Sequence, residues 1–343
     1  MKGIILHGGH GTRLRPLTHT GPKQLLPIAN KPMSEYCLEA IKDSKIRDIA
    51  IIIGGVGNEK VKEYYGNGEK FGVKITYIEQ DEPRGIAHAI KLCKNFIHNE
   101  KFLVFLGDNI IQKSILDLKE NFEKSNFDAT VLLCEVENPS RFGIADMKDS
   151  KISKIIEKPK DPPTNFAVTG IYFLTPKIFE IIDELKPSWR NEYEITDALQ
   201  LLLEKNNNIS YEMITDYWKD TGTPEDIINA NTQILKNISE NVLKKEDSTV
   251  IDSGSSIIMP SIVGKNCHIG KGVRIGPNTS IGNNTIISSN VSIKNSIIMS
   301  DCRIEGGLKI NNSIISANCH LEGNNSDDSE KLFLLGEGTR ISL

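Results

Sequence analysis

A glycine-rich loop near the start of the chain contains residue types that bind phosphate. It covers residues 6–16 (LHGGHGTRLRP) and follows the apolar run 3–6, which is typical of a buried parallel strand. Glycines after such a strand let the backbone turn so that its N–H groups face one cavity. Residues 1–34 contain no acidic residue, although the net charge of the chain is −4. They contain five cationic residues, which favour an anion as the ligand: Lys2, Arg13, Arg15, Lys23 and Lys31.

Arg13 and Lys23 suggest what the loop could do with an anion. A guanidinium offers two parallel donors and an ammonium is a mobile point charge, so together they could hold a triphosphate during reaction at its α-phosphorus. An ordinary glycine-rich turn surrounded by solvated cations is the alternative. The loop contains neither G-x-x-x-x-G-K-[ST] nor G-x-G-x-x-G. A Walker-type ATPase and a dinucleotide dehydrogenase are therefore disfavoured.

The same loop resembles a known family. Residues 8–16 with Pro22 and Lys23 are similar to the G-G-x-G-T-R-L-x-P and Pro-Lys signature of the sugar-1-phosphate nucleotidylyltransferases. The resemblance implies a Rossmann-like domain that makes a nucleotide sugar from a nucleoside triphosphate and a sugar 1-phosphate. His7 departs from the small residue of many members. The loop residues that the resemblance assigns to the nucleotide are Leu6, Gly8, Gly9, Gly11, Thr12, Arg13 and Lys23.

Length and composition set the broad class. A chain of 343 residues can bury two cores, and 38% apolar with 25% charged residues is typical of a globular protein in water. No run approaches the length of a membrane span and no signal sequence is evident, so a cytoplasmic protein is expected. The six cysteines form no C-x-x-C pair, which predicts reduced thiols. A sequence pI near 6.0 argues against nucleic acid as a partner.

Apolar runs alternate with amphipathic stretches from residue 2 to about residue 236. This alternation predicts an α/β fold with a mostly parallel sheet covered on both faces. In such sheets ligands bind beyond the carboxyl ends of the strands, where the remaining motifs all lie. The predicted strands are 3–6, 49–53, 74–77, 102–106, 129–135, 152–157 and 170–174.

Residues 79–89 leave a strand, turn, and begin a helix. The segment resembles the family's Q-x-x-x-x-G-x-A motif, which implies that the Gln80 side chain and the Gly85 backbone contact the nucleobase. A primary amide suits that role, because it offers one acceptor and two donors to a base edge. A solvated turn before a helix is the alternative.

Two aspartates are the predicted metal ligands. Asp108 follows the apolar strand 102–106, and G-D-N at residues 107–109 resembles the family motif whose Asp binds Mg²⁺. W-x-D-x-G at residues 218–222 supplies Asp220 by the same resemblance. Magnesium commonly takes one or two carboxylates together with phosphate oxygens and water. Taken singly, each Asp is more often a turn or cap residue.

Three further motifs between these aspartates match the family's hexose-phosphate site in order: residues 141–144, 156–159 and 168–172. By this resemblance Glu157 accepts from sugar hydroxyls and Lys158 neutralises the 1-phosphate. Phe142 replaces the Tyr of many members. Residues 192–197 resemble E-x-x-I-T-D, expected to be structural or to line the sugar pocket. The remaining residues expected to bind the substrate are Asn109, Gly143, Val168 and Tyr172.

The sequence pattern changes after a predicted helix at 224–243 and a polar linker at 244–248. Aliphatic residues then recur every six positions, the pattern of a parallel β-helix in which each six-residue repeat forms one flat face with its aliphatic residue pointing inward. Long forms of the family have a left-handed one, so we expect a catalytic domain at 1–237, a linker at 238–250 and a β-helix at 251–343. The periodicity breaks near 305–307. The predicted inward residues are Ile257, Val263, Ile269, Ile275, Ile281, Ile287, Ile293 and Met299.

Residues 335–341 resemble the ending of long glucose-1-phosphate thymidylyltransferases, which favours dTTP and glucose 1-phosphate as substrates. The alternative is an enzyme that uses UTP, or a bifunctional one that also acetylates an amino-sugar phosphate. Acetyl transfer needs a general base, and the repeat region contains only His268 and His320. A non-catalytic homologue is disfavoured because Arg13, Lys23, Asp108 and Asp220 are all present. The repeats are expected to form a homo-oligomer.

Overall fold

The computed structural model describes all residues except 10, 239–243, 246–247 and 325–328. The chain divides into two compact units. One comprises Met1–Gly9 and Ser34–Asp220, and the other comprises His10–Met33 and Thr221–Leu343. The domain boundaries at 237 and 250 stay predictions. Much of the predicted linker falls in 239–243 and 246–247, outside the described residues.

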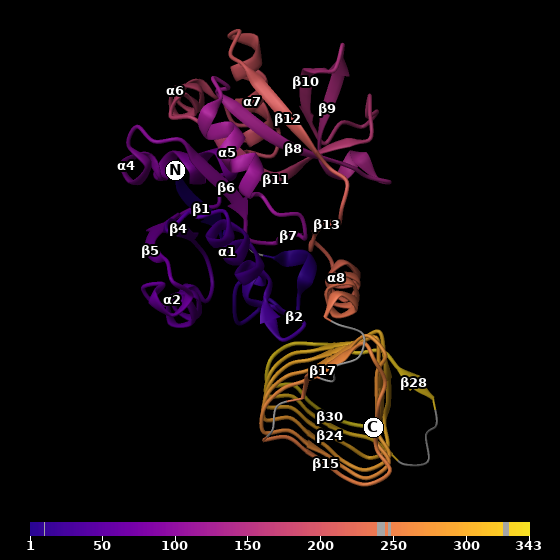
Figure 1. Ribbon diagram of the computed structural model, residues 1–343. Coiled ribbons are helices and arrows are strands. Elements are labelled where there is room, and N and C mark those ends of the chain that lie inside the picture. The colour runs from indigo at the N-terminus through magenta and orange to yellow at the C-terminus, as the bar shows by residue number, and fades with distance from the viewer. Residues whose placement is uncertain (10, 239–243, 246–247, 325–328) are drawn as a thin grey trace. The chain divides into compact units, whose positions relative to one another are not determined.

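The first unit contains a nine-stranded sheet (Figure 1). Its order is β10-β9-β11-β6-β1-β4-β5, and β8 pairs with both β11 and β12. Strands β6, β1, β4 and β5 are parallel, whereas β11, β9 and β10 add antiparallel pairs. The predicted Rossmann-like core is therefore confirmed. The strands are β1 (Lys2–Leu6), β4 (Asp48–Ile53), β5 (Lys74–Glu79), β6 (Phe102–Leu106), β8 (Ala129–Glu135), β9 (Gly143–Lys148), β10 (Lys151–Glu157), β11 (Phe166–Leu174) and β12 (Ile209–Ile214).

Helices cover both faces of the central strands. Ile4 and Leu6 of β1 pack with α3, α6 and α7 in one apolar cluster. A Cβ atom on Gly3 would lie 3.0 Å from a methyl group of Ile41, so the opposite face meets α1. Burial on both faces explains why these strands read as continuous apolar runs. The helices are α1 (Met33–Asp43), α2 (Asn58–Tyr65), α3 (Ile86–Leu92), α4 (Lys94–Ile97), α5 (Leu116–Lys124), α6 (Lys177–Glu184) and α7 (Ile195–Glu204).

All seven predicted strands are present, and two strands of the sheet were missed. β9 (GIADMK) ends in polar residues, and β12 (ISYEMI) has partly buried residues at five of its six positions. Neither has the apolar run or strict alternation that identifies a strand in a sequence. A separate two-stranded sheet joins β7 (Asn109–Ile111) to β13 (Trp218–Asp220).

The second unit contains a parallel β-helix, seen in Figure 1 as stacked coils. Its strands form three sheets, so the predicted left-handed β-helix class is confirmed. The first sheet holds β14 (Lys244–Lys245), β17 (Ser261–Val263), β20 (Thr279–Ile281), β23 (Ile297–Ile298), β26 (Ile314–Ile315) and β29 (Leu334–Leu335). The second holds β15 (Val250–Ile251), β18 (His268–Ile269), β21 (Ile286–Ile287), β24 (Arg303–Glu305), β27 (His320–Glu322) and β30 (Arg340–Ser342). The third holds β16 (Ser256–Ile257), β19 (Arg274–Ile275), β22 (Ser292–Lys294), β25 (Lys309–Asn311) and β28 (Glu330–Lys331).

The predicted row of inward aliphatic residues is confirmed, with one correction. Val263 stacks on Ile281, which is 18 residues later, but Ile281 stacks on Ile298, which is 17 residues later. The six-residue count had placed Met299 in this row, and the coil that is one residue shorter places Ile298 there instead. Stacking continues to β30, and the inward residues Ile304 and Ile310 keep the six-residue spacing across 305–307, so the predicted break there is wrong.

The remaining elements of the second unit precede the β-helix. Helix α8 (Pro224–Asn237) begins at the cap residue Thr223, whose hydroxyl accepts from the backbone N–H of Asp226 at 3.2 Å. Its predicted extension to residue 243 falls outside the described residues. A short hairpin joins β2 (Pro27–Ile28) to β3 (Lys31–Pro32). In the part of the chain that the structure describes, no helix is long and apolar enough to cross a membrane.

Two adjacent isoleucines of β21 test the inward row. Ile287 is 1% exposed, whereas its neighbour Ile286 is 41% exposed. Ile287→Ala leaves a cavity and should lower the free energy of unfolding by about 2–5 kcal/mol. Ile286→Ala serves as the matched control and should change it by less than about 1 kcal/mol. Denaturant unfolding of both variants measures the difference, and equal losses would contradict the assignment of the inward face.

Candidate functional site

The predicted metal carboxylates both lie at the strand pair β7–β13, Asp108 in the turn before β7 and Asp220 within β13. Asp108 follows β6 and is 8% exposed, and Asp220 in β13 is paired in register with Asn109 in β7. Asn109 donates from Nδ2 to Oδ1 of Asp108 at 3.0 Å. Its own Oδ1 accepts from the backbone N–H of Gly170 at 3.2 Å and from Nε1 of Trp218 at 2.8 Å. The buried amide of Asn109 therefore orients Asp108 and links it to β11 and β13.

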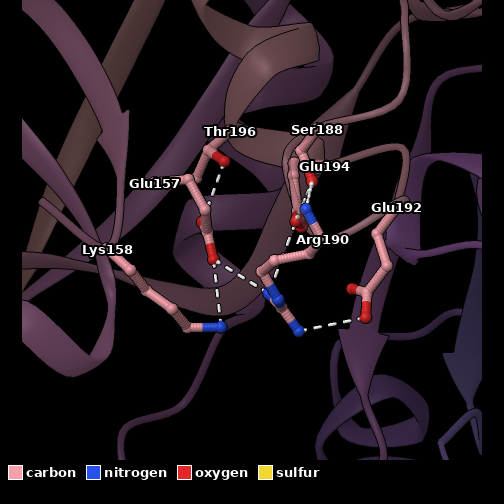
Figure 2. A network of polar contacts seen from close by, with 7 residues as sticks. All are labelled: Glu157, Lys158, Ser188, Arg190, Glu192, Glu194 and Thr196. Atoms are coloured by element: carbon pink, nitrogen blue, oxygen red, sulfur yellow. Dashed lines mark hydrogen bonds and ion pairs between the residues drawn. The ribbon is translucent and has the colours of Figure 1, made fainter.

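Glu157 is the centre of a polar network at the end of β10 (Figure 2). Its Oε1 lies 3.1 Å from Nζ of Lys158 and 3.5 Å from Nη1 of Arg190, and its Oε2 accepts from the Thr196 hydroxyl at 2.9 Å. A Cβ atom on Gly143 would lie 2.4 Å from a Thr196 carbon, so a glycine is needed there. Glu157, Lys158 and Gly143, all predicted for the sugar site, are brought together.

Arg190 is the residue of this site that the sequence analysis missed. Its Nη2 lies 3.0 Å from Oε1 of Glu192, and its Nη1 lies 3.4 Å from Oε1 of Glu194 (Figure 2). Glu194 is 4% exposed, and burial followed by the negative charge of Glu157 raises its pKa. The sequence did contain a signal for it, because Arg190 precedes Glu192 by two residues and Glu194 by four. A buried carboxylate in that motif must have a cationic or donor partner.

Val168 and Tyr172 both lie in β11, and both are buried in the apolar cluster of the sheet. Burial raises the pKa of Tyr172, and the negative charges of Glu157 and then Asp108 raise it further. Tyr172 thus lies within electrostatic range of both Glu157 and Asp108. Direct substrate contact by Val168 and Tyr172 stays a prediction.

The segment predicted to bind the nucleobase is attached to the loop that contains Arg190. Gln80 is 7% exposed, and its Nε2 lies 3.3 Å from the Gly85 carbonyl oxygen and 3.0 Å from Nδ1 of His88. Gly85 has φ +99°, and a Cβ atom there would lie 2.5 Å from the Tyr193 carbonyl oxygen. Tyr193 donates its backbone N–H to Arg84 at 2.8 Å. The base and sugar segments therefore share backbone hydrogen bonds.

The loop after β1 is divided between the two units. A Cβ atom on Gly8 would lie 3.4 Å from Oε1 of Gln80, which places Gly8 at the predicted base site. Gly11, with φ +56°, belongs to the second unit, where a Cβ atom would lie 3.3 Å from Cβ of Lys23. Close approach of Arg13 and Lys23 to Asp108 therefore stays a prediction, as do the nucleotide contacts of Leu6, Gly9 and Thr12. His10 lies outside the described residues.

His7 is buried where many family members have a small residue. Its ring packs edge-on against Tyr65 of α2 at 5.9 Å between ring centres. Among the described residues neither ring nitrogen has a hydrogen-bond partner. Burial lowers the pKa of His7 from 6.5 to about 3, although the negative charge of Asp108 opposes the shift. The imidazole is therefore neutral at pH 7.

Two families match this chain. Residues 2–237 match the nucleotidyl transferase family, and residues 257–342 match the GMPPB C-terminal domain. The chain therefore belongs to the nucleotidyl transferase family, and its catalytic fold and motifs agree with that class.

Individual relatives within this family have more specific names. The chain is 48% identical to the low-salt glycan biosynthesis nucleotidyltransferase Agl11 of Haloferax volcanii, over 73% of this chain and 71% of that protein. It is 39% identical to a glucose-1-phosphate thymidylyltransferase of Streptomyces antibioticus, over 78% of this chain and 74% of that protein. It is also 38% identical to the bifunctional protein GlmU of Methanococcus maripaludis, over 77% of this chain but 62% of that longer protein.

A solved structure gives the same indication. A Bacillus anthracis protein crystallised under the description glucose-1-phosphate thymidylyltransferase superposes with a TM-score of 0.65. It is 42% identical, and the match covers 68% of this chain and 94% of that one. The match supports the fold of the catalytic part and its assignment to sugar-1-phosphate nucleotidyl transfer.

Enzymes of this family generally use a divalent metal. The residues present fit one, because Asp220 is paired with Asn109, the residue after Asp108, and Asp108 is largely buried. Buried carboxylates need a cation or hydrogen-bond donors, and hard oxygen ligands suit Mg²⁺. No group of three or more His, Cys, Asp or Glu residues gathers within the described ranges, so a site built from the protein alone is absent there. Two carboxylates leave ligand positions for substrate oxygens.

The buried His7 makes stability depend on pH. A pKa lowered in the folded state means that the unfolded chain binds the proton more readily, so this contribution is complete above pH 6.5 and is lost as pH falls toward 3. Going from pH 7 to pH 5 should cost about 2 kcal/mol through His7. Denaturant unfolding at both pH values, for the wild type and for His7→Phe, isolates this term. An equal pH dependence in the two proteins would refute it.

Proposed function

We propose that this chain transfers dTMP from dTTP to glucose 1-phosphate, with pyrophosphate as the second product. The named relatives support the two substrates, and the motifs at residues 8–16, 107–109 and 156–159 support the reaction class. The observation that carries the proposal is the pair of cations, Lys158 and Arg190, which meet at one carboxylate oxygen of Glu157. A carboxylate suits sugar hydroxyls and the cations beside it suit a sugar phosphate.

The reaction is an in-line displacement. An oxygen of the sugar 1-phosphate attacks the α-phosphorus of dTTP, and the bond to the pyrophosphate oxygen breaks. A phosphate dianion is already a nucleophile at pH 7, so no general base is required. The protein contributes position and charge: Lys158 and Arg190 align the attacking phosphate, and Glu157 holds the sugar. Gln80 and the Gly85 backbone orient the base.

The triphosphate has its own set of ligands. Arg13 and Lys23 hold the β- and γ-phosphates, with the loop amides of Gly8–Thr12 around them. Asp108 and Asp220 would hold Mg²⁺, which when bound would offset negative charge on the phosphates. Asn109 keeps the Asp108 carboxylate in place for that role.

A bifunctional enzyme is the second candidate, since a bifunctional GlmU is among the relatives. The β-helix contains two histidines beside carboxylates: His268 lies 3.2 Å from Asp252, and His320 lies 2.8 Å from Glu305. Such a pair could serve as a general base for acetyl transfer. An assay with acetyl-CoA and glucosamine 1-phosphate distinguishes the candidates, because release of CoA would favour the bifunctional enzyme.

We also infer a homo-oligomer formed through the β-helix. Of the eight large apolar side chains exposed among the described residues, five belong to this part of the chain: Val250, Ile258, Ile286, Leu332 and Leu343. Exposed apolar side chains favour association. Light scattering of the intact chain measures the number of subunits. A cytoplasmic location stays a prediction.

Substrate choice is tested with a panel. The four deoxynucleoside triphosphates and UTP are each paired with glucose, mannose and N-acetylglucosamine 1-phosphates, and pyrophosphate release is measured. We expect the highest kcat/KM for dTTP with glucose 1-phosphate. A base pocket discriminates a single methyl group by only about 1–3 kcal/mol, so UTP should retain measurable turnover. A clear preference for UTP with N-acetylglucosamine 1-phosphate would reject the proposed pair.

Lys158 is predicted to act on the sugar phosphate only. Lys158→Ala should raise the KM for glucose 1-phosphate by about 10-fold or more, since a charge-assisted contact is lost, and should leave the KM for dTTP nearly constant. Lys160, two residues away and exposed, provides the matched control Lys160→Ala, which should change neither constant. Steady-state kinetics with each substrate varied in turn measures the effect. Similar losses for both substrates would place Lys158 elsewhere in the site.

The two metal carboxylates should each be essential. Asp108→Asn and Asp220→Asn keep the side-chain shape and remove one charge, so turnover should fall at least ~100-fold. The exposed Asp117 provides the control Asp117→Asn. Rates are measured over a series of Mg²⁺ concentrations, and the two site variants should need more Mg²⁺. Near-normal turnover in either one would contradict the metal assignment.

A further inference from the structure

Asn231 joins three parts of the second unit. It lies in α8 and is 1% exposed. Its Oδ1 accepts from the backbone N–H of Ala29 at 2.8 Å and from the Ser280 hydroxyl at 2.6 Å, and its Nδ2 donates to the Asn278 carbonyl oxygen at 3.4 Å. Ala29 belongs to the hairpin turn, whereas Ser280 and Asn278 belong to a coil of the β-helix. One buried amide thus connects the hairpin to the β-helix.

The hairpin is held at its other turn residue as well. Asn30 donates from Nδ2 to the Ile281 carbonyl oxygen at 2.6 Å. Ala29 and Asn30 have φ of 49° and 63°, so both are in the left-handed region, where Ala in particular is unusual. Contacts that fix each of these two residues separately compensate for such a turn. The geometry of the turn therefore depends on α8 and on the β-helix.

The hairpin directly follows Lys23. The one-turn helix Lys23–Leu25 leads into β2, and the Leu26 carbonyl oxygen accepts from the backbone N–H of Met33 at 3.1 Å, which closes the base of the hairpin. A second contact lies nearer to Arg13: a Cβ atom on Gly336, in the last coils of the β-helix, would lie 3.1 Å from the Pro16 carbonyl oxygen. The segment that contains both predicted triphosphate ligands therefore contacts the β-helix at two places, the hairpin turn and Pro16.

We propose that the β-helix is part of the nucleotide-binding machinery, with Asn231 and Asn30 as positioning residues that hold the Lys23 segment ready for the triphosphate. The proposal rests on the proposed role of Arg13 and Lys23. A segment fixed before the ligand arrives loses less conformational entropy on binding, so its fixation strengthens binding of the nucleotide and leaves the sugar phosphate unaffected. The β-helix then has a role in each subunit, independent of oligomer formation.

The test uses the intact chain and two variants from opposite sides of the contact. Asn231→Ala removes the buried amide, and Asn30→Gly removes the other amide while keeping a residue that tolerates positive φ. We expect each to raise the KM for dTTP by about 10-fold, because buried partners are left unpaired, with the KM for glucose 1-phosphate unchanged. The matched control is Asn229→Ala, an exposed position of the same helix, and it should change neither constant.

The outcome distinguishes this inference from the proposed function. If Lys23→Ala raises the KM for dTTP but Asn231→Ala and Asn30→Gly do not, the positioning role fails and the triphosphate site stands. If Lys23→Ala has no effect, the assignment of Lys23 fails, and the inference fails with it. Should Asn231→Ala not fold, Asn30→Gly and Ser280→Ala decide. In the double variant, Asn231→Ala should raise the KM for dTTP by a smaller factor than it does in the wild-type background. If the two factors multiply fully, the proposal is overturned.

Discussion

The partly buried carboxylate of Glu157 is surrounded by cationic and hydrogen-bonding groups, and the arrangement of the site follows from them. Its side chain is 16% exposed, and both of its oxygens have partners: Lys158 and Arg190 on one, Thr196 on the other. A charge removed from water needs such compensation. Arg190 must therefore reach inward from its loop, and the same loop is tied through Tyr193 to the turn at Gly85. The partners that one carboxylate requires thus bring the sugar segment and the base segment into one continuous structure.

A similar argument applies to Asp108 at the end of β6. The strand is buried, so the carboxylate that ends it needs a donor, and the Asn109 amide supplies it at 3.0 Å. That amide in turn accepts from β11 and from Trp218 in β13, so its orientation is fixed from two sides. The G-D-N and W-x-D motifs are more than a hundred residues apart in sequence, yet β7 and β13 pair so that Asp220 lies opposite Asn109. This strand pairing places Asp220 beside the residue that follows Asp108.

The sequence predicts well whatever depends on local pattern, such as the apolar parallel strands and the six-residue repeat with its inward row. It predicts the paired positions of Asp108 and Asp220 only through the resemblance of both motifs to one family. It indicates the local partners of Arg190, Glu192 and Glu194, but not its contact with Glu157, which becomes evident only once β10 lies beside the loop before α7. The exchange of Met299 for Ile298 has a similar cause: a coil one residue shorter changes no composition, and only the stacking on Ile281 reveals it. Strands β9 and β12 were missed because neither has the apolar run or the strict alternation by which a strand is identified in a sequence.

Residues 10–33 belong to the same compact unit as the β-helix, so the β-helix can support this segment as well as form its own core. A parallel β-helix is rigid because every coil is hydrogen-bonded to the coils on either side, and its inward row is closely packed. Glycine-rich phosphate loops lack such internal order and must gain it from what they pack against. Here the hairpin after Lys23 has a positive-φ turn that its own sequence disfavours at Ala29, and the amide of Asn231 satisfies that residue's backbone N–H. The rigidity of the repeats is thereby transmitted to the segment around Lys23 by a few hydrogen bonds.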